Sequence, residues 1–221
     1  MTATFYTRFG KRWFDAAASF AGIVLLSPFL AAVAIAVRLT SAGPVLFRQE
    51  RSGRFEKPFH ILKFRTMKVQ PPGAGLLVTV AEDPRVTPLG RWLRKTKIDE
   101  LPQLFNVLAG DMSLVGPRPE VSLYTAIYSA NQKRVLLVRP GITSPKISFD
   151  EEALLAGNAN PERFYRETLM PAKLELDLAY CENICFAEDL HILFRTVGQV
   201  FGTTLHQIKT PPSHLDSSSC E

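Results

Sequence analysis

The sequence lacks the motifs of the common nucleotide-binding folds. Its 221 residues contain no Gly-x-x-x-x-Gly-Lys segment of a P-loop and no Gly-x-Gly-x-x-Gly fingerprint of a dinucleotide site. The four histidines are scattered, with neither the spacing of metal ligands nor a nucleophile beside them. P-loop and Rossmann sites are therefore excluded, and the candidates for catalysis are carboxylates and cations.

Cysteine is scarce as well. Cys181, Cys185 and Cys220 make an odd number and offer no disulfide framework, which is typical of a protein in a reducing compartment. Cys181 and Cys185 stand four positions apart on a predicted helix, but no second pair of ligands has a matching spacing. Packing is therefore favoured over metal binding, and the soluble part of the chain is expected in the cytosol.

The length of the chain fits one medium-sized domain with a membrane element attached, and two large domains are unlikely on size grounds. Lysine and arginine total 26 against 21 Asp and Glu, and the basic residues are concentrated between Arg8 and Lys97. This distribution predicts anionic partners for the N-terminal half. Nucleic acid is disfavoured as a partner, because no basic recognition helix with aromatic stacking residues is present.

A long apolar run stands near the N-terminus. No charged side chain interrupts it from Ala16 to Val37, and a helix of this length measures about 33 Å, enough to cross a bilayer. Ser27 and Pro28 lie in its middle. Proline removes one helix hydrogen bond and pushes against the carbonyl of Val24, so a bend is expected, where the Ser27 hydroxyl can satisfy a carbonyl.

Basic residues flank both ends of this run, with Arg8, Lys11 and Arg12 before it and Arg38 and Arg48 after it. Such residues favour the cytoplasmic side of a membrane. A kinked transmembrane helix places one basic cluster outside, whereas a re-entrant helix-break-helix returns both to the same face. From the residues alone, both topologies remain open.

The rest of the chain predicts an α/β domain of helices and short strands. Pro- and Gly-rich residues 70–75 predict a loop, and residues 209–221, rich in Pro and Ser, predict a disordered tail. We therefore divide the chain into a membrane segment (1–40), a folded domain (41–208) and this tail. Strands are expected at 45–49 and 59–67, and helices from Thr87 and Pro88 through Lys95, near 99–108, and at 120–135, 161–180 and 188–201. The last helix has one apolar face, for which core packing is favoured over contact with a membrane surface.

The densest charged cluster lies between Arg91 and Gln103, where four cations precede the adjacent carboxylates of Asp99 and Glu100. Thr96 can cap a helix there, which places the pair in or beside a first turn that stabilises anions. Neighbouring helix positions point about 100° apart, so we expect divided roles, one carboxylate attacking phosphorus and the other holding Mg²⁺. The alternative is a capped helix with solvent-facing charges, and an Asp-Glu pair by itself favours that alternative.

Three further places offer cations for phosphate. Arg118 stands between Pro117 and Pro119, which restrict its backbone, and its planar guanidinium matches phosphate oxygens. A rigid surface loop is the alternative there. Two weaker candidates are the Lys63 and Arg65 pair, alternating on one strand face, and Arg139, which precedes a Pro-Gly turn.

Five segments together resemble the bacterial sugar transferase family, the monotopic polyprenyl-phosphate phosphoglycosyl transferases. They are Lys63-Phe-Arg-Thr-Met67, Arg94-Lys-Thr-x-x-Asp-Glu-Leu-Pro-Gln103, Leu104-Phe-Asn-Val-Leu108, Asp111-Met-Ser-Leu-Val-Gly-Pro-Arg-Pro119 and Arg139-Pro-Gly-Ile-Thr143. The resemblance runs from the membrane segment to about Phe201. It implies that Asp99 is the nucleophile, that Glu100 binds Mg²⁺, that Arg94 and Arg118 contact phosphates, and that Lys63 lies near the donor phosphates.

The resemblance also implies a membrane arrangement and a reaction. A re-entrant segment bent at Ser27 and Pro28, with amphipathic interfacial helices, would seat residues 41–208 as the catalytic domain on the cytosolic face of a bacterial inner membrane. A UDP-sugar would give its sugar 1-phosphate to undecaprenyl phosphate and release UMP, through a covalent aspartyl intermediate, as the first membrane step of surface glycan assembly. Membrane lipid is then a partner, and a homo-oligomer is compatible with the sequence.

Two segments depart from this pattern. Ser144-Pro-Lys-Ile-Ser148 replaces the Gly-x-Ala-Gln-Val common in the family, which puts donor-sugar contacts there in doubt. The segment that begins at Pro161 has no role assigned by the resemblance. The rival hypothesis is a catalytically silent scaffold that binds anionic lipid, and the intact Asp99, Glu100 and Arg118 count against it.

Overall fold

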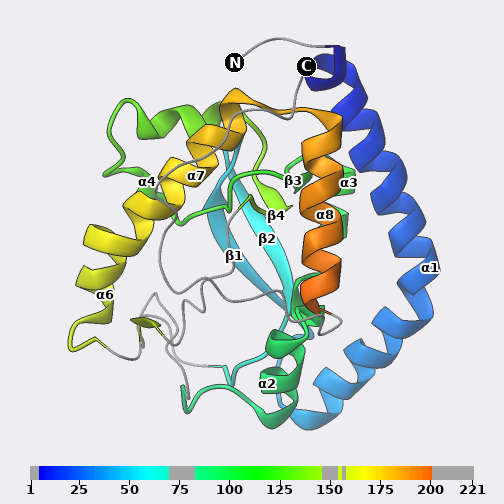
Figure 1. Ribbon diagram of the computed structural model, residues 1–221. Helices are drawn as coiled ribbons and strands as arrows, with labels where there is room; N and C mark the ends of the chain where they lie inside the picture. Colours follow the sequence, from blue (N-terminus) through cyan, green and yellow to red (C-terminus); the bar gives the residue numbers. More distant parts are fainter. Residues whose placement is uncertain (1–4, 70–82, 146–153, 156–157, 201–221) are drawn as a thin grey trace.

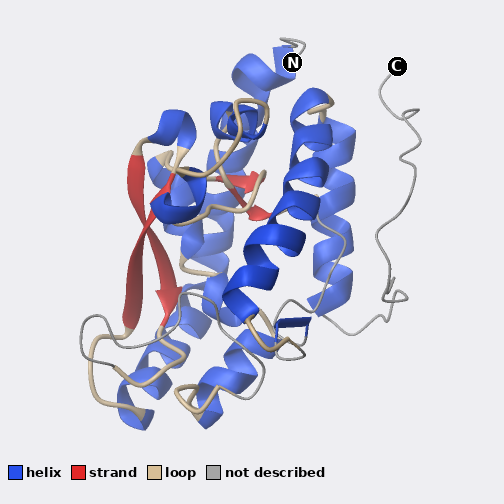
Figure 2. Ribbon diagram, turned by 90° about the vertical axis from the view of Figure 1, so that its left-hand side faces the viewer, coloured by secondary structure: helices blue, strands red, loops and turns tan. Residues whose placement is uncertain are grey.

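The computed structural model describes residues 5–69, 83–145, 154–155 and 158–200. It is a mixed α/β arrangement, as predicted, with helices around two small sheets (Figure 1). The predicted loop at 70–75 and the predicted tail at 209–221 lie outside the described residues. Figure 2 shows the longer sheet along one side of the molecule, with helices on the other.

Both sheets have two strands. In the longer one β1 (Leu46–Ser52) pairs antiparallel with β2 (Pro58–Phe64), and in the shorter one β3 (Ser113–Val115) pairs parallel with β4 (Gly141–Thr143). The α-helices are α1 (Lys11–Thr40), α2 (Pro88–Lys95), α3 (Gln103–Ala109), α4 (Ser122–Thr125), α6 (Pro161–Phe164), α7 (Met170–Glu182) and α8 (Phe186–Val200). Shorter 3₁₀ segments lie at Arg54–Glu56, Ile98–Glu100 and Gln132–Leu137, and π-helical turns at Tyr6–Gly10 and Tyr165–Leu169.

Helix α1 is continuous through Pro28, so the helix-break-helix predicted for residues 1–40 takes the form of one long helix. Its path curves around the edge of the molecule (Figure 1). The Ser27 hydroxyl donates to the carbonyl of Val24 at 2.9 Å, the carbonyl that the proline ring deprives of its partner. The prediction that Ser27 satisfies this group is confirmed.

Both halves of α1 pack on the same domain. Near its start, Arg12 donates to the carbonyls of Val107 at 2.6 Å and Leu108 at 2.9 Å. In its second half, Val33 and Val37 are buried in a cluster that includes Leu93. Both ends of α1 are therefore attached to the same domain.

The outer face of α1 is apolar and exposed, as at Phe20, Leu25 and Leu39. In the part of the chain that the structure describes, the helix Tyr6–Thr40 is the one long and apolar enough to cross a membrane. Apolar surface of this extent on a single helix is typical of contact with lipid or with another protein. The structure therefore agrees with the predicted membrane element in length and composition.

The main core lies between the short sheet and the C-terminal helices. Val107 and Met112 on one side and Ile192 on the other are fully buried in it. Ile192 confirms core packing for α8, whereas Phe194 on the same helix is 68% exposed. Cys181 is buried with a free thiol.

Local signals in the sequence predicted most elements correctly. The side chain of Thr87 accepts from the backbone N–H of Gly90 at 2.9 Å, capping α2 with Pro88 in its first turn. The helix predicted at 120–135 is wrong in its middle, because Ser129 and Gln132 form a reciprocal capping box that starts a separate 3₁₀ turn. The predicted helix at 161–180 is present as α6, a π-helical turn and α7.

Candidate active site

The Asp99 and Glu100 pair lies in a tight turn between α2 and α3. Lys97 adopts a left-handed conformation with φ of 57°, which turns the chain after α2. The 3₁₀ segment Ile98–Glu100 follows directly and leads into α3. Thr96 does not cap this turn as predicted, because its hydroxyl donates to the carbonyls of Trp92 and Leu93 and so ends α2.

Glu100 joins three segments that are distant in sequence. Its Oε1 accepts from Lys63 Nζ on β2 at 2.8 Å and from Arg118 Nη2 at 2.9 Å. Burial alone would raise the pKa of Glu100, but Arg118 and Lys63 together lower it well below its usual range. Burial lowers the pKa of Lys63, and Glu100 opposes that effect. Glu100 is therefore an ionised carboxylate held between two cations.

Asp99 has a different environment from its neighbour. It is 6% exposed, and its Oδ1 makes no hydrogen bond with any residue that the structure describes. Burial and the charge of Glu100 raise the pKa of Asp99 to about 6, although Lys63, Lys97 and Arg94 act to lower it. Desolvation of the buried carboxyl therefore outweighs the effect of the nearby cations on the pKa of Asp99.

The structure brings Lys63, Arg94 and Arg118 to the carboxylate pair. Arg94 lies in the last turn of α2, close enough for its charge to lower the pKa of Asp99. Glu100 raises the pKa of Arg118, so this guanidinium is fully charged. Two of the predicted phosphate-binding cations, Lys63 and Arg118, thus contact the predicted carboxylate of Glu100.

Arg65 is not part of this site. Its guanidinium donates to the carbonyl of Ser41 at 2.7 Å and to that of Val37 at 3.3 Å, and it contacts the carbonyl of Pro44. These groups lie at and just beyond the C-terminus of α1, where carbonyls lack helical partners and a cation is favoured. The prediction of phosphate contact by Arg65 is not supported, because its donors cap α1.

Arg139 is also occupied elsewhere, since its Nε donates to the carbonyl of Gly110 at 2.8 Å. The Pro-Gly that follows it supports the Arg118 loop instead. The Gly141 N–H donates to the carbonyl of Pro117 at 2.9 Å, and a Cβ on Gly141 would lie 2.1 Å from the backbone nitrogen of Gly116. Only glycine permits this close approach, which fixes the loop carrying Arg118 against β4.

Two residues beside the pair were not predicted. Arg51 and Gln103 line a small pocket together with Lys63 and Arg118. Gln103 is 2% exposed, and its Nε2 has no hydrogen-bond partner among the described residues. The sequence signal that could have identified Gln103 is its place at the end of the Asp-Glu-Leu-Pro-Gln run. Arg51 donates to the carbonyl of Pro119 at 3.3 Å, which links β1 to the same loop.

The carboxylates fit a magnesium ion only in combination with substrate. No group of three or more His, Cys, Asp or Glu side chains suited to a metal occurs among the residues that the structure describes. Both cations bond Glu100 through Oε1, and Asp99 Oδ1 is buried and unpartnered within the described structure. Since Mg²⁺ takes one or two carboxylates plus substrate phosphate oxygens, Glu100 Oε2 and Asp99 are compatible ligands.

Comparison with known proteins identifies the family of the chain. The family model described as bacterial sugar transferase matches residues 6–203, and the chain belongs to this family of transferase enzymes. It is 39% identical over 196 residues to the UDP-glucose:undecaprenyl-phosphate glucose-1-phosphate transferase of Caulobacter vibrioides, covering 87% of this chain and 70% of that one. The exopolysaccharide production protein PSS of Rhizobium leguminosarum is 38% identical, with 85% and 92% covered.

A third relative acts on a different sugar by its name. It is the UDP-N-acetylgalactosamine-undecaprenyl-phosphate N-acetylgalactosaminephosphotransferase of Aeromonas hydrophila, 37% identical, with 87% of this chain and 44% of that one covered. The chain covers only 37% of the Escherichia coli relative and 40% of the Klebsiella pneumoniae relative. These longer relatives carry additional sequence outside the shared region.

Proposed function

We propose that this chain transfers a sugar 1-phosphate from a UDP-sugar to undecaprenyl phosphate and releases UMP. The names of its relatives support this substrate pair. The observation that carries the proposal is the pairing of a buried, unpartnered Asp99 with a Glu100 that two cations hold. One carboxylate is poised to react while the other is fixed in place.

The reaction runs in two displacements at one phosphorus. The Asp99 carboxylate attacks the β-phosphorus of the donor, the bond from this phosphorus to the bridging oxygen breaks, and UMP leaves with that oxygen and the electron pair. The product is an acyl phosphate that links Asp99 to the sugar phosphate. An oxygen of undecaprenyl phosphate then attacks the same phosphorus and releases the carboxylate, which gives the sugar on a lipid diphosphate.

The cations of the site hold the anionic reactants. Arg118 offers a planar fork suited to phosphate oxygens, and Arg94 and Lys63 add positive charge around the pair. When bound at Glu100, Mg²⁺ supplies further neutralisation of the diphosphate charge. Asp99 stays buried, so its approach to phosphorus excludes water, which would otherwise hydrolyse the donor.

Two attachments of α1 support the membrane arrangement that accompanies this function. Arg12 fixes the start of the helix to α3, and Val37 fixes its end to Leu93, both on the catalytic domain. Together with the exposed apolar face of α1, these attachments support a position of the helix within one leaflet, with both ends on the cytosolic side of the bacterial inner membrane. The lipid acceptor reaches the site from that leaflet. Its product begins a surface glycan such as an exopolysaccharide.

A donor panel tests this function. The purified chain in nanodiscs that contain undecaprenyl phosphate is incubated with Mg²⁺ and each of a set of UDP-sugars, and UMP release is measured. We expect release with at least one donor and formation of the matching lipid diphosphate sugar. Absence of UMP with every donor, from protein that is folded and membrane-inserted, contradicts the proposal and favours the lipid-binding scaffold.

A further inference from the structure

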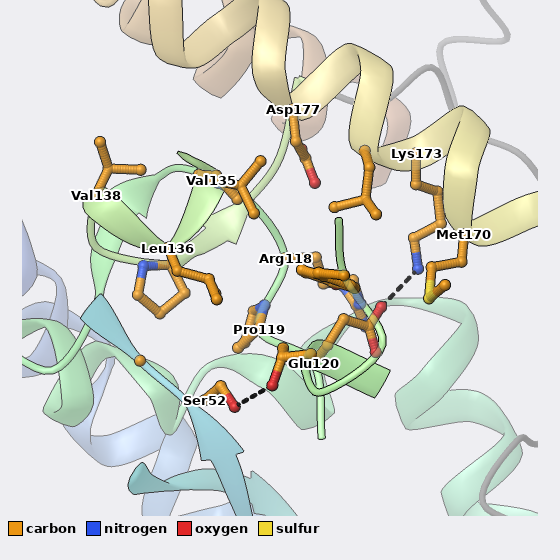
Figure 3. A pocket seen from close by; sticks show the side chains of 16 residues that line it. Ser52, Arg118, Pro119, Glu120, Val135, Leu136, Val138, Met170, Lys173 and Asp177 are labelled. Carbon is orange, nitrogen blue, oxygen red and sulfur yellow. Dashed lines mark hydrogen bonds and ion pairs between the residues drawn. The ribbon is translucent and has the colours of Figure 1, made fainter. Parts of the chain in front are cut away.

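Arg118 lies near two carboxylates, and it bonds only one of them among the described residues. Its guanidinium contacts Glu100 at 2.9 Å. Glu120 stands two positions further along the same loop, and its charge also raises the pKa of Arg118. Figure 3 shows Arg118, Pro119 and Glu120 together in one pocket. Arg118 and Glu120 line this pocket together, so Glu120 is a second carboxylate that could compete with Glu100 for the guanidinium.

Glu120 is occupied by side chains from the segment that begins at Pro161. Lys173 Nζ on α7 contacts Glu120 Oε1 at 3.0 Å, and the Tyr165 hydroxyl donates a short hydrogen bond to the same oxygen. Lys173 also donates to the Tyr165 oxygen at 2.9 Å. The other carboxylate oxygen, Oε2, lies 3.7 Å from Arg51 Nη1. Glu120 is thereby neutralised without using Arg118.

The contacts of Lys173 and Tyr165 with Glu120 are buried, which strengthens them. Lys173 is 6% exposed and Glu120 11% exposed as side chains, and interactions between charges are stronger where water is excluded. The backbone of the loop is tied down as well, since the Ser52 N–H donates to the Glu120 carbonyl at 2.9 Å. The loop therefore keeps its position, and the remaining freedom is the direction of the Arg118 side chain.

We propose that Lys173 and Tyr165 are positioning residues for Arg118. By saturating Glu120, they leave Glu100 as the carboxylate that binds this guanidinium, beside Asp99 and the donor diphosphate. Neither residue touches the reacting atoms. The segment that begins at Pro161, which has no role by resemblance, thus acts on the site through Glu120. The kinetic test of this inference rests on the proposed function. The structural test, the position of the Arg118 side chain in a variant, does not.

The kinetic test uses the full chain in nanodiscs and rates per folded molecule. Lys173→Met removes the closest cation from Glu120, so Arg118 turns to this carboxylate, and we expect kcat to fall about tenfold. Adding Glu120→Gln removes the competing charge and should recover most of that loss. Arg118→Met should lower kcat severely in the wild type. In the Lys173→Met variant, the same substitution should lower kcat only a little further. The matched control is Lys133→Met, which breaks an exposed 3.0 Å bridge to Glu56 and should leave kcat unchanged.

Two results overturn the inference and leave Lys173 with a merely structural contact. One is a loss of kcat in the Lys173→Met, Arg118→Met double variant that equals the sum of the two single losses. The other is a Lys173→Met, Glu120→Gln double variant whose kcat is no higher than that of Lys173→Met alone. If Lys173→Met does not fold, Tyr165→Phe removes one bond to Glu120 and should shift kcat in the same direction. A structure of the variant that folds decides the matter without activity. We expect the Arg118 guanidinium at Glu120; a guanidinium still on Glu100 refutes the proposal even if no UDP-sugar proves to be a substrate.

Discussion

Asp99 and Glu100 are sequence neighbours with opposite electrostatic environments. The pKa of Glu100 is held far below its usual range by two cations, whereas the pKa of Asp99 rises to about 6 through burial. Paired carboxylates whose environments separate their pKa values usually have separate chemical roles. The sequence predicted this division from helix geometry alone. It could not predict how deeply Asp99 is buried, because that depends on segments far away in the chain.

Glu100→Gln tests the metal role. Glutamine keeps the shape but loses the charge that holds Lys63 and Arg118 and would bind Mg²⁺. We expect activity to fall about 10- to 100-fold and the Mg²⁺ concentration for half-maximal rate to rise. The matched control is Glu182→Gln, which removes the carboxylate of an exposed bridge to Arg134. Unchanged turnover and Mg²⁺ dependence in Glu100→Gln would remove this residue from the metal site.

Arg65→Met separates a structural role from a substrate role. The guanidinium caps the end of α1, and hydrogen bonds to a charged group stabilise by about 1.5–3 kcal/mol. The thermal unfolding temperature should therefore fall, while the KM for the donor stays the same in the protein that remains folded. Arg48→Met, at an exposed position on β1, should change neither. A raised KM at unchanged stability would restore Arg65 to the substrate site.

At the scale of elements, the prediction to test is that both ends of helix α1 lie on the same side of the membrane. Cysteine substitutions at the exposed positions Arg8 and Glu50 flank the helix, in a background whose own cysteines are replaced. We expect neither to react with an impermeant maleimide in spheroplasts, and both to react after the membrane is opened, because both ends attach to one domain. Labelling at Arg8 from outside, with Glu50 protected, would show that α1 spans the membrane.

The contact between α2 and the segment after β2 depends on one glycine. A Cβ at Gly90 would lie 2.0 Å from the carbonyl oxygen of Thr66, so alanine there forces α2 away from the segment that follows β2. We expect Gly90→Ala to destabilise by about 1–3 kcal/mol or more, measured by thermal or denaturant unfolding. Gly22→Ala is the matched control in α1, where a Cβ would meet Leu104 at an ordinary 3.5 Å. Equal stability of the two variants would contradict this packing account.

The elements that the sequence predicted well are those with local signals. The cap of Thr87 on α2 and the hydrogen bond of Ser27 next to Pro28 both join residues within four positions of each other, and both are present. The Thr96 cap failed because its hydroxyl bonds backward into α2, an equally local alternative. Arg65 failed for a tertiary reason, since alternation along β2 does not reveal that the end of α1 lies beside it. The close contact of Gly116 with Gly141 was likewise beyond any local pattern.

At the scale of the whole molecule, the active site is assembled where distant segments meet. Lys63 comes from β2, the carboxylate pair from the turn before α3, and Arg118 from a loop held against β4. The membrane helix packs on the same structural unit at both ends. In the proposed reaction, this arrangement brings a water-soluble donor and a lipid acceptor to the same site. The motif residues were predictable from the sequence, but their convergence required the fold.

The central claim is that Asp99 becomes covalently linked to the sugar phosphate. Intact-mass measurement of the protein after incubation with the accepted UDP-sugar and Mg²⁺, without lipid acceptor, tests it most directly. We predict a mass gain equal to one sugar phosphate together with UMP release, and neither in Asp99→Asn, which keeps its size and remains inserted in the membrane. UMP that appears only when undecaprenyl phosphate is present, with no adduct trapped, or near wild-type turnover by Asp99→Asn, would contradict the covalent mechanism and indicate direct transfer.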